Sequence, residues 1–237
     1  MHHEHRNIDN PVEAIVEEAM LHYDAVVIGA GHGLDGGFGP LVEDVLSRCP
    51  IPVVVVRPPR RSSGLPWAFA RGLVPVNGAL SSRPAQEVAG YISSRIGTRL
   101  SFLHVSAEPV NVVESVLGDH SPHDRQARNI LHEAAALATT AGANFSAIVE
   151  HADNPAGQIA ASADELDVDV VVVSGRSRTN AGRLSLGQTI PAVLRSIDCT
   201  IVAVLVPEPS VTDATEAPVA ELLPADEPVG PDPVLVP

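Results

Sequence analysis

The chain alternates between short valine-rich runs and longer segments whose apolar residues recur with a helical period. Parallel strands that are covered on both faces lose the alternation of polar and apolar residues, so we interpret the valine runs as parallel strands. The strand candidates are residues 24–29, 51–56, 71–76, 99–105, 143–149, 169–174 and 200–206, and the helix candidates include 12–20, 82–96, 125–141 and 156–166. This order predicts an α/β fold with a doubly wound parallel sheet.

An internal repeat organises these elements. The triplet Asp9-Asn10-Pro11 recurs as residues 153–155, and each triplet is followed by a helix pattern, an aspartate before a valine run, a glycine-containing loop and a second apolar strand. The first copy contains only helix, strand, helix, strand, which is half of a domain. We expect a half domain in residues 1–57, a linker in 58–69 and a complete domain with a doubly wound parallel sheet in 70–206.

Charge is distributed unevenly along the 237 residues, whose formal net charge is −14. Residues 207–237 contain seven acidic residues, eight prolines and no arginine, so they carry half of this charge. Such a segment cannot bury enough apolar surface to offset its ordering entropy. We expect a disordered acidic tail there, and the acidity of the whole chain argues against a nucleic-acid partner.

All 15 cationic residues are arginine, because the sequence has no lysine. This excludes a phosphate-loop NTPase and a Schiff-base enzyme, both of which need a lysine amine. The two cysteines, Cys49 and Cys199, do not make a disulfide framework, and no apolar run reaches the roughly 20 residues of a membrane span. We predict a cytoplasmic protein without direct membrane insertion, in which Cys199 is buried rather than reactive.

Candidate chemistry is sparse. The segment Gly31–Gly36 matches the letters of a dinucleotide fingerprint, but the glycines and Pro40 that follow prevent a helix from starting there. The sequence around His120 and His123 is interpreted as a solvated loop, and no metal site is predicted. With no nucleophile elbow and no carboxylate pair in a defined cleft, we predict a protein without catalytic residues that is not an enzyme.

Three segments resemble one known family. Leu73-Val-Pro-Val-Asn-Gly78, with Ser81-Ser82-Arg83 opening a helix, is similar to the first strand and turn of universal stress proteins. Leu100–Val105 resembles their second strand, and Val193–Ile201 resembles their closing helix and strand. The resemblance implies a five-stranded parallel sheet, homodimers through the last strand and, in one subgroup, ATP binding.

The nucleotide-binding subgroup carries Gly-x2-Gly-x9-Gly-(Ser/Thr) after the fourth strand, where glycines let the backbone approach phosphates. Here the same register reads Ser174-x2-Ser177-x9-Gly187-Gln188, and Asn77 stands where the family usually has aspartate. These differences leave open whether the ligand is ATP, AMP, another adenine nucleotide or no cofactor at all. Arg176, Arg178 and Arg183 make the loop favourable for anions. The candidate nucleotide or anion site is Val76, Asn77, Gly78, Val105, Ser174, Gly175, Arg176, Ser177, Arg178, Gly187, Gln188 and Thr189.

A narrower resemblance concerns the arrangement of the copies. A half domain before a full one, with a Pro-Val-Asn-Gly turn at residues 75–78 and a Gly-Pro pair at 39–40, is similar to the cytosolic tail of certain bacterial cation/proton antiporters. It implies a regulatory module that acts by binding and has a membrane transporter domain as partner. The alternative is a nucleotide-hydrolysing or nucleotidyl enzyme that uses the cleft at the carboxyl ends of the strands.

Overall fold

The computed structural model describes residues 10–31, 37–59, 69–106, 122–180 and 183–208. Its first four elements are α1 (Pro11–Ala19), β1 (Val26–Gly29), α2 (Pro40–Arg48) and β2 (Val53–Arg57). The remaining elements are β3 (Arg71–Pro75), η1 (Leu80–Ser82), α3 (Arg83–Ile96), β4 (Arg99–Ser106), α5 (Pro122–Thr140), β5 (Asn144–His151), α6 (Pro155–Glu165), β6 (Val170–Asn180), β7 (Arg183–Ser185), α7 (Thr189–Ser196) and β8 (Thr200–Pro207). Most predicted elements are therefore confirmed to within a few residues at their ends.

The central sheet has the strand order β1-β2-β8-β6-β3-β4-β5, with the short β7 paired to β6. The five strands β8, β6, β3, β4 and β5 are all parallel, which confirms the predicted five-stranded parallel sheet. From β3 the chain builds outward through β4 to β5, and it then returns to the other side of β3 with β6. The strand order therefore reverses between β3 and β6, where ligands of open α/β sheets bind.

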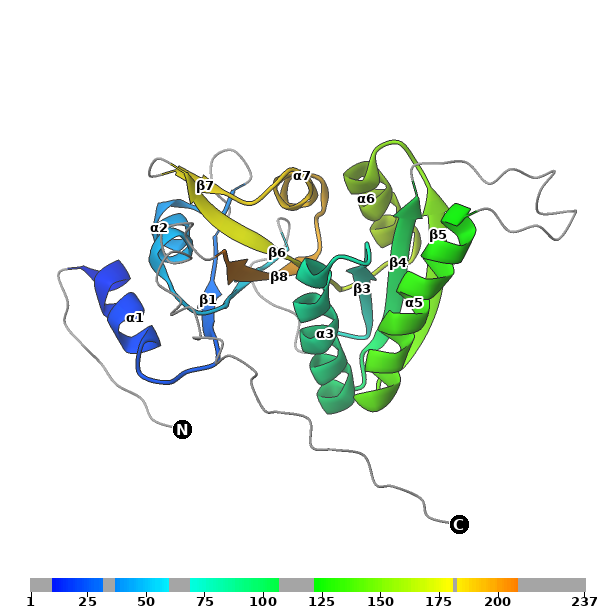
Figure 1. The fold of residues 1–237 in the computed structure, drawn as a ribbon, viewed down its shortest axis with the longest axis horizontal. Coiled ribbons are helices and arrows are strands. Elements are labelled where there is room, and N and C mark those ends of the chain that lie inside the picture. Colours follow the sequence, from blue (N-terminus) through cyan, green and yellow to red (C-terminus); the bar gives the residue numbers. More distant parts are fainter. Residues whose placement is uncertain (1–9, 32–36, 60–68, 107–121, 181–182, 209–237) are drawn as a thin grey trace, which may run out of the picture.

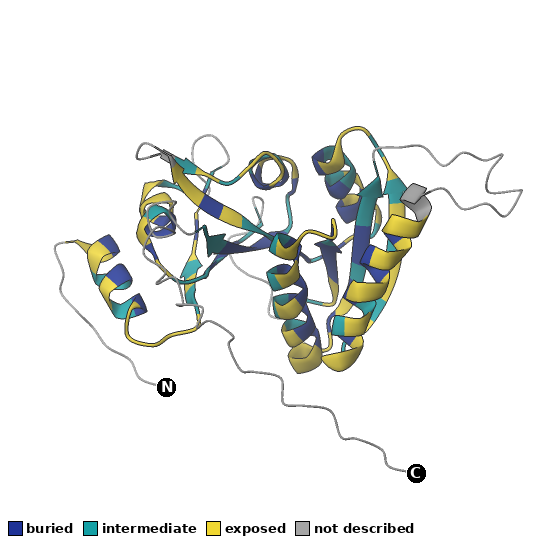
Figure 2. Cartoon of the chain, viewed as in Figure 1, coloured by how far each residue is buried: buried dark blue, intermediate teal, exposed yellow. Residues whose placement is uncertain are grey.

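Helices cover both faces of this sheet, with α3 and α5 on one face and α6 and α7 on the other (Figure 1). Two apolar cores result, and buried residues gather between the helices and the strands (Figure 2). Val172 belongs to the core beneath α3 and α5, whereas its neighbour Val173 belongs to the core beneath α6 and α7. Because successive side chains on a strand point to opposite faces, a continuous valine run contributes to both cores.

The N-terminal elements extend the same sheet. β1 pairs parallel with β2, and β2 pairs antiparallel with β8 in a register centred on Val55 and Ala203. β8 is therefore an interior strand between β6 and β2 and has no free edge. The predicted homodimer through the last strand is wrong in this respect, because the chain covers that edge with its own β2.

The segments α1–β1 and α6–β6 share unusual local geometry. Asn10 and Asn154 each precede a helix whose first residue is proline, and each side chain accepts a hydrogen bond from the amide three residues later, at 3.4 and 3.1 Å. After each helix one non-glycine residue adopts a positive φ: His22 at 69° and Asp167 at 46°. The two segments therefore share the same helix cap and the same kind of turn after the helix.

Two boundaries differ from those predicted. The strand predicted to end at residue 174 continues as β6 to Asn180, and β7 pairs back onto it, so the predicted loop begins as a hairpin. The ladder with β8 extends to Ser177 and Pro207, which places Pro207 in a strand rather than in the tail. Residues 209–237, all but the first residue of the segment 31–36 that matches the letters of a dinucleotide fingerprint, and most of the predicted linker lie outside the described residues.

Candidate functional site

A cleft of about 760 Å³ opens at the carboxyl ends of β3 and β6. The ladder between these strands is short, with Gly72 opposite Val170 and Leu73 opposite Val171, so the strands part above it. All predicted site residues except two line the cleft: Val76, Asn77, Val105, Ser174, Gly175, Arg176, Arg178, Gly187, Gln188 and Thr189. The switch point of the sheet therefore brings together residues that are more than 100 positions apart in the sequence.

The two exceptions are Gly78 and Ser177. Ser177 is buried in the ladder opposite Pro207, and its carbonyl accepts a hydrogen bond from the Glu208 amide at 3.0 Å. Gly78 lines a neighbouring hollow of about 450 Å³ that is bounded by Gln86 and Ile130. Neither residue lines the cleft, so the structure does not support their assignment to the site.

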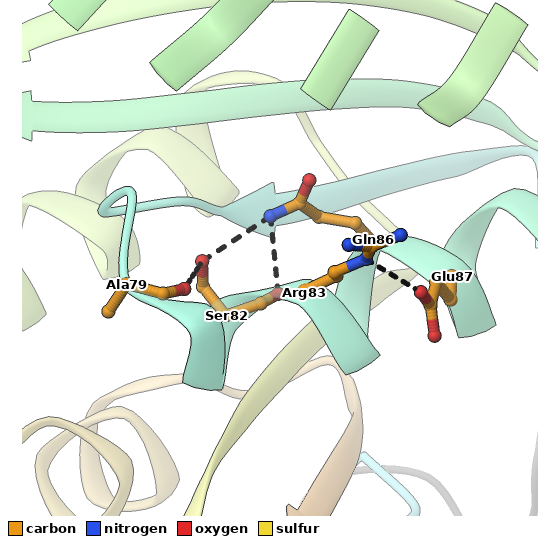
Figure 3. Close-up of polar contacts among 5 residues, drawn as sticks. All are labelled: Ala79, Ser82, Arg83, Gln86 and Glu87. Carbon is orange, nitrogen blue, oxygen red and sulfur yellow. Dashed lines mark hydrogen bonds and ion pairs between the residues drawn. The ribbon is translucent and has the colours of Figure 1, made fainter. Parts of the chain in front are cut away.

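One wall of the cleft is the turn from β3 through η1 into α3. The Asn77 carboxamide oxygen accepts a hydrogen bond from the Ala79 amide at 3.0 Å, which holds the turn. The Ser82 hydroxyl donates to the Ala79 carbonyl at 2.8 Å, and the Gln86 side chain donates to Ser82 (Figure 3). This bond fixes the orientation of the carboxamide, whose amide nitrogen is the group that can donate to a ligand.

The opposite wall is the start of α7. Gly187 has a φ of 71°, a left-handed conformation that favours glycine, and it turns the chain from β7 into the helix. Gln188, the N-cap residue, makes no side-chain capping bond. The first amides of a helix have no partner within the helix, and they lie at the positive end of its dipole. This wall can therefore receive an anion.

Two arginines on β6 add positive charge to the cleft. Arg176 and Arg178 both line it, and both form ion pairs with Glu208, the Arg176 Nη1–Glu208 Oε1 pair at 3.4 Å. Residues 176 and 178 project to the same side of the strand, and Glu208 follows β8 directly beside them. One carboxylate therefore neutralises part of the charge of two arginines.

Sequence reasoning missed Glu208 because it assigned residues 207–237 to the tail. The available signal was the parallel register of β6 and β8, which places residue 208 beside 178 once β6 is extended. It also missed that the Ser174 hydroxyl donates to the Ser81 carbonyl at 2.7 Å, which ties β6 to η1 across the cleft. The third predicted arginine, Arg183, begins β7, and its side chain lies outside the described residues.

The C-terminal end of α7 is held by a residue of β2. The Arg57 side chain is fully buried and donates hydrogen bonds to the carbonyls of Leu194 and Ile197, the latter at 2.9 Å. These groups belong to the last turn of α7 and the residue after it, where carbonyls lack partners within the helix. Arg57 thus fixes one end of the helix whose other end lines the cleft.

Burial raises the pKa of the Cys199 thiol to about 11, partly opposed by a hydrogen bond to backbone and by Arg57. We therefore expect the native thiol to react with iodoacetamide at pH 8 about a hundredfold more slowly than the urea-unfolded thiol, since only the thiolate is nucleophilic. Mass spectrometry of quenched samples measures this rate, with the Cys49→Ala variant isolating Cys199. A native rate equal to the unfolded rate would contradict the prediction. The Cys199 thiol has a lower pKa in the unfolded chain than in the folded protein, so it loses its proton there first. The free energy of unfolding should therefore fall as the pH rises from about 9 to 11.

Within the described ranges, no group of three or more His, Cys, Asp or Glu residues is placed to hold a metal ion. His120 of the predicted loop falls outside these ranges, whereas the backbone of His123 lies in the first turn of α5, so the prediction of a loop is wrong there. In the part of the chain that the structure describes, no helix is both long and apolar enough to cross a membrane.

The fold and this cleft can be compared with known proteins. A universal stress protein from Archaeoglobus fulgidus DSM 4304 has a TM-score of 0.51 at 19% identity, over 81% of this chain and 64% of its own. The Archaeoglobus fulgidus universal stress protein in complex with dAMP matches 57% of this chain and 98% of its own, with 16% identity and a TM-score of 0.45. A universal stress protein in complex with cAMP matches 57% and 96%, with 21% identity and a TM-score of 0.43.

At 19% identity, the first of these comparisons supports a common fold but no statement about a shared ligand or role. The comparison with curated proteins found no match to the sequence. A sequence model of the universal stress protein family, however, matches residues 69–204, which include every strand from β3 to β6 and most of β8. Because the matched segment is more than half of the chain, this protein belongs to the universal stress protein family.

Proposed function

We propose that this protein binds an adenine mononucleotide in the cleft between β3 and β6 and acts by binding rather than by catalysis. The observation that carries the proposal is the convergence of Arg176, Arg178 and the uncapped start of α7 on one cleft. Arginine and helix-start amides are the donors that hold phosphate in proteins. Solved relatives that hold dAMP and cAMP support the same class of ligand.

A single phosphate suits this cleft better than a triphosphate. The family's ATP-binding members use a glycine-rich loop after the fourth strand, but here residues 174–177 continue the ladder with β8. The ladder uses alternate amides of this segment and keeps it extended, so the segment cannot fold into a loop that surrounds a chain of phosphates. The remaining donors are the two arginines and the first turn of α7. Apolar side chains that are at least partly exposed, such as Leu80, Val105 and Leu186, form another part of the lining and offer a surface for the base.

Calorimetric titration of the full chain with AMP, cAMP and ATP tests this proposal. We expect saturable heat with AMP or cAMP and weaker binding of ATP. No heat with any of the three at millimolar concentration would contradict nucleotide binding. Magnesium-dependent release of phosphate from ATP, lost in Thr189→Ala, would instead favour the enzyme that remained as the alternative.

We also propose a regulatory setting in which the chain is the soluble tail of a cation/proton antiporter and contacts its membrane domain. The support is the sequence resemblance of the half-plus-full arrangement. A bound nucleotide would shift the transporter's equilibrium only if its affinity differs between two states of the protein. The coding sequence upstream of residue 1 tests this setting. About a dozen apolar segments in the same reading frame would support it, and an in-frame stop codon would contradict it.

A further inference from the structure

β1 is an end strand among the described strands, yet its residues are those of an interior strand. It reads Val-Val-Ile-Gly, without a polar side chain. The strand at the opposite end of the sheet, β5, instead carries Asn144, Ser146, Glu150 and His151. Edge strands are normally protected by charged or polar residues, because an apolar edge with unpaired amides attracts another strand. β5 has this protection and β1 lacks it.

A matched pair of residues shows what is missing at β1. Val27 and Val172 each stand three residues after the aspartate that precedes their strand, Asp24 and Asp169. Val172 is 1% exposed in the core beneath α3, whereas Val27 is 71% exposed. The equivalent position is therefore covered by a helix on β6 and open on β1. Exposed apolar side chains just before β1 enlarge the open surface: Met20, Leu21 and Tyr23.

The two aspartates show the same contrast in hydrogen bonding. One oxygen of the Asp169 carboxylate accepts bonds from the Ala70 and Arg71 amides, both at 2.8 Å, and so fastens the start of β3 beside β6. Asp24 is exposed, and no described strand lies beside it on that edge.

The backbone of β1 is also used on one side only. The Val26 amide donates a hydrogen bond to the Pro52 carbonyl, and the Ala30 amide donates to the Val56 carbonyl. β2 therefore forms hydrogen bonds with every second residue of β1. In a parallel ladder the intervening groups, those of Val27 and Gly29, face away from that partner. The open edge therefore offers backbone donors and acceptors, an apolar face and a carboxylate in the arrangement that β6 offers to β3.

We propose that the free edge of β1 and the face around Val27 bind a β–α unit of a partner polypeptide, a strand parallel to β1 followed by a helix that covers Val27. This goes beyond the nucleotide cleft and does not depend on it. Charge favours a partner strand that starts with basic and amide donors, as β3 does with Arg71. The described residues 10–57 hold six acidic residues against two arginines, one of them buried: Glu13, Glu17, Glu18, Asp24, Glu43 and Asp44 against Arg48 and Arg57.

A second copy of the chain fits this edge less well. Its own β3–α3 unit is already held between β6 and β4, so a folded copy cannot donate that unit. Two copies joined at β1 by twofold symmetry would pair their edges antiparallel and leave both Val27 side chains uncovered. A separate β–α unit can pair with the backbone of β1 through its strand and cover Val27 with its helix.

A synthetic peptide of residues 69–97, labelled with a fluorophore, serves as the probe because it carries the β3–α3 unit that covers the equivalent edge. Titrated with the full chain, its fluorescence anisotropy should rise and saturate. Val27→Lys should weaken this binding on the order of tenfold or more, because the helix would bury an unpaired charge. Val149→Lys, at an exposed valine of β5, is the matched control and should bind like the native chain.

Hydrogen exchange of the full chain with and without the peptide locates the contact. We expect new protection of the Val27 and Gly29 amides and none in β5. Absence of peptide binding, equal binding by Val27→Lys and the native chain, or protection elsewhere would overturn the proposal. A dimer of the native chain that Val27→Lys abolishes, measured by sedimentation, would also overturn it in favour of a second copy on this edge.

Discussion

Replacing Arg176 and Arg178 together by alanine is expected to lower the affinity for AMP by roughly thirtyfold to a hundredfold, because each arginine can form one or more charge-assisted hydrogen bonds with phosphate. Both side chains line the cleft beside the start of α7, where no other described cation lies. Both are about half exposed, so their removal should leave the fold intact. Calorimetric titration measures the change, and Arg95→Ala, at the end of α3 and outside the cleft, is the control.

Replacing Glu208, at the same site, should change the affinity for AMP in the opposite direction. Its carboxylate is paired with both arginines, so a phosphate must compete with it. We expect Glu208→Gln to raise AMP affinity by about threefold to tenfold, since ion pairs that are partly exposed are each worth roughly 0–1 kcal/mol. If both the arginine and the glutamate variants bind AMP like the native chain, the phosphate does not bind at these residues.

The elements of this fold could be predicted because its strands are buried on both faces. Runs such as the four valines at 170–173 exclude an amphipathic helix, and the Asn-Pro pairs mark the helix starts that the caps confirm. The cleft could be predicted for the same reason: once the strand order is known, the ends of β3 and β6 must meet at its reversal. Ten of the predicted residues lie together in this cleft, and their role in binding stays a prediction.

The remaining features depend on pairings that a local pattern does not specify. Serine at positions 174 and 177 lets β6 continue as a strand where glycine would favour a loop, but only the β8 partner makes that continuation stable. Likewise, an apolar last strand predicts a covered edge without saying which chain covers it. Here β2 of the same chain covers the edge of β8 by antiparallel pairing, with Val55 opposite Ala203. The positions of Glu208 and Arg57 follow from these two pairings.

Replacing Arg57 by methionine is expected to lower the free energy of unfolding by about 3 kcal/mol, because two buried carbonyls lose their donor. Methionine retains much of the apolar volume, so the loss reports hydrogen bonding more than a cavity. Arg57 is 0% exposed and lies in the ladder opposite Ile201, while its guanidinium reaches Leu194 and Ile197. Urea unfolding followed by circular dichroism measures the change.

The matched control is Arg48→Met, which removes an exposed arginine from the last turn of α2 and should change stability by about 0.5 kcal/mol or less. Arg57 belongs to β2, and the two carbonyls that accept its hydrogen bonds lie at the end of α7. The native protein should therefore unfold in one transition that includes both segments. In Arg57→Met, the start of α7 should also become less well ordered, so AMP affinity should fall together with stability. An unchanged unfolding midpoint would show that the α7 carbonyls find other donors, and it would contradict the role assigned to Arg57.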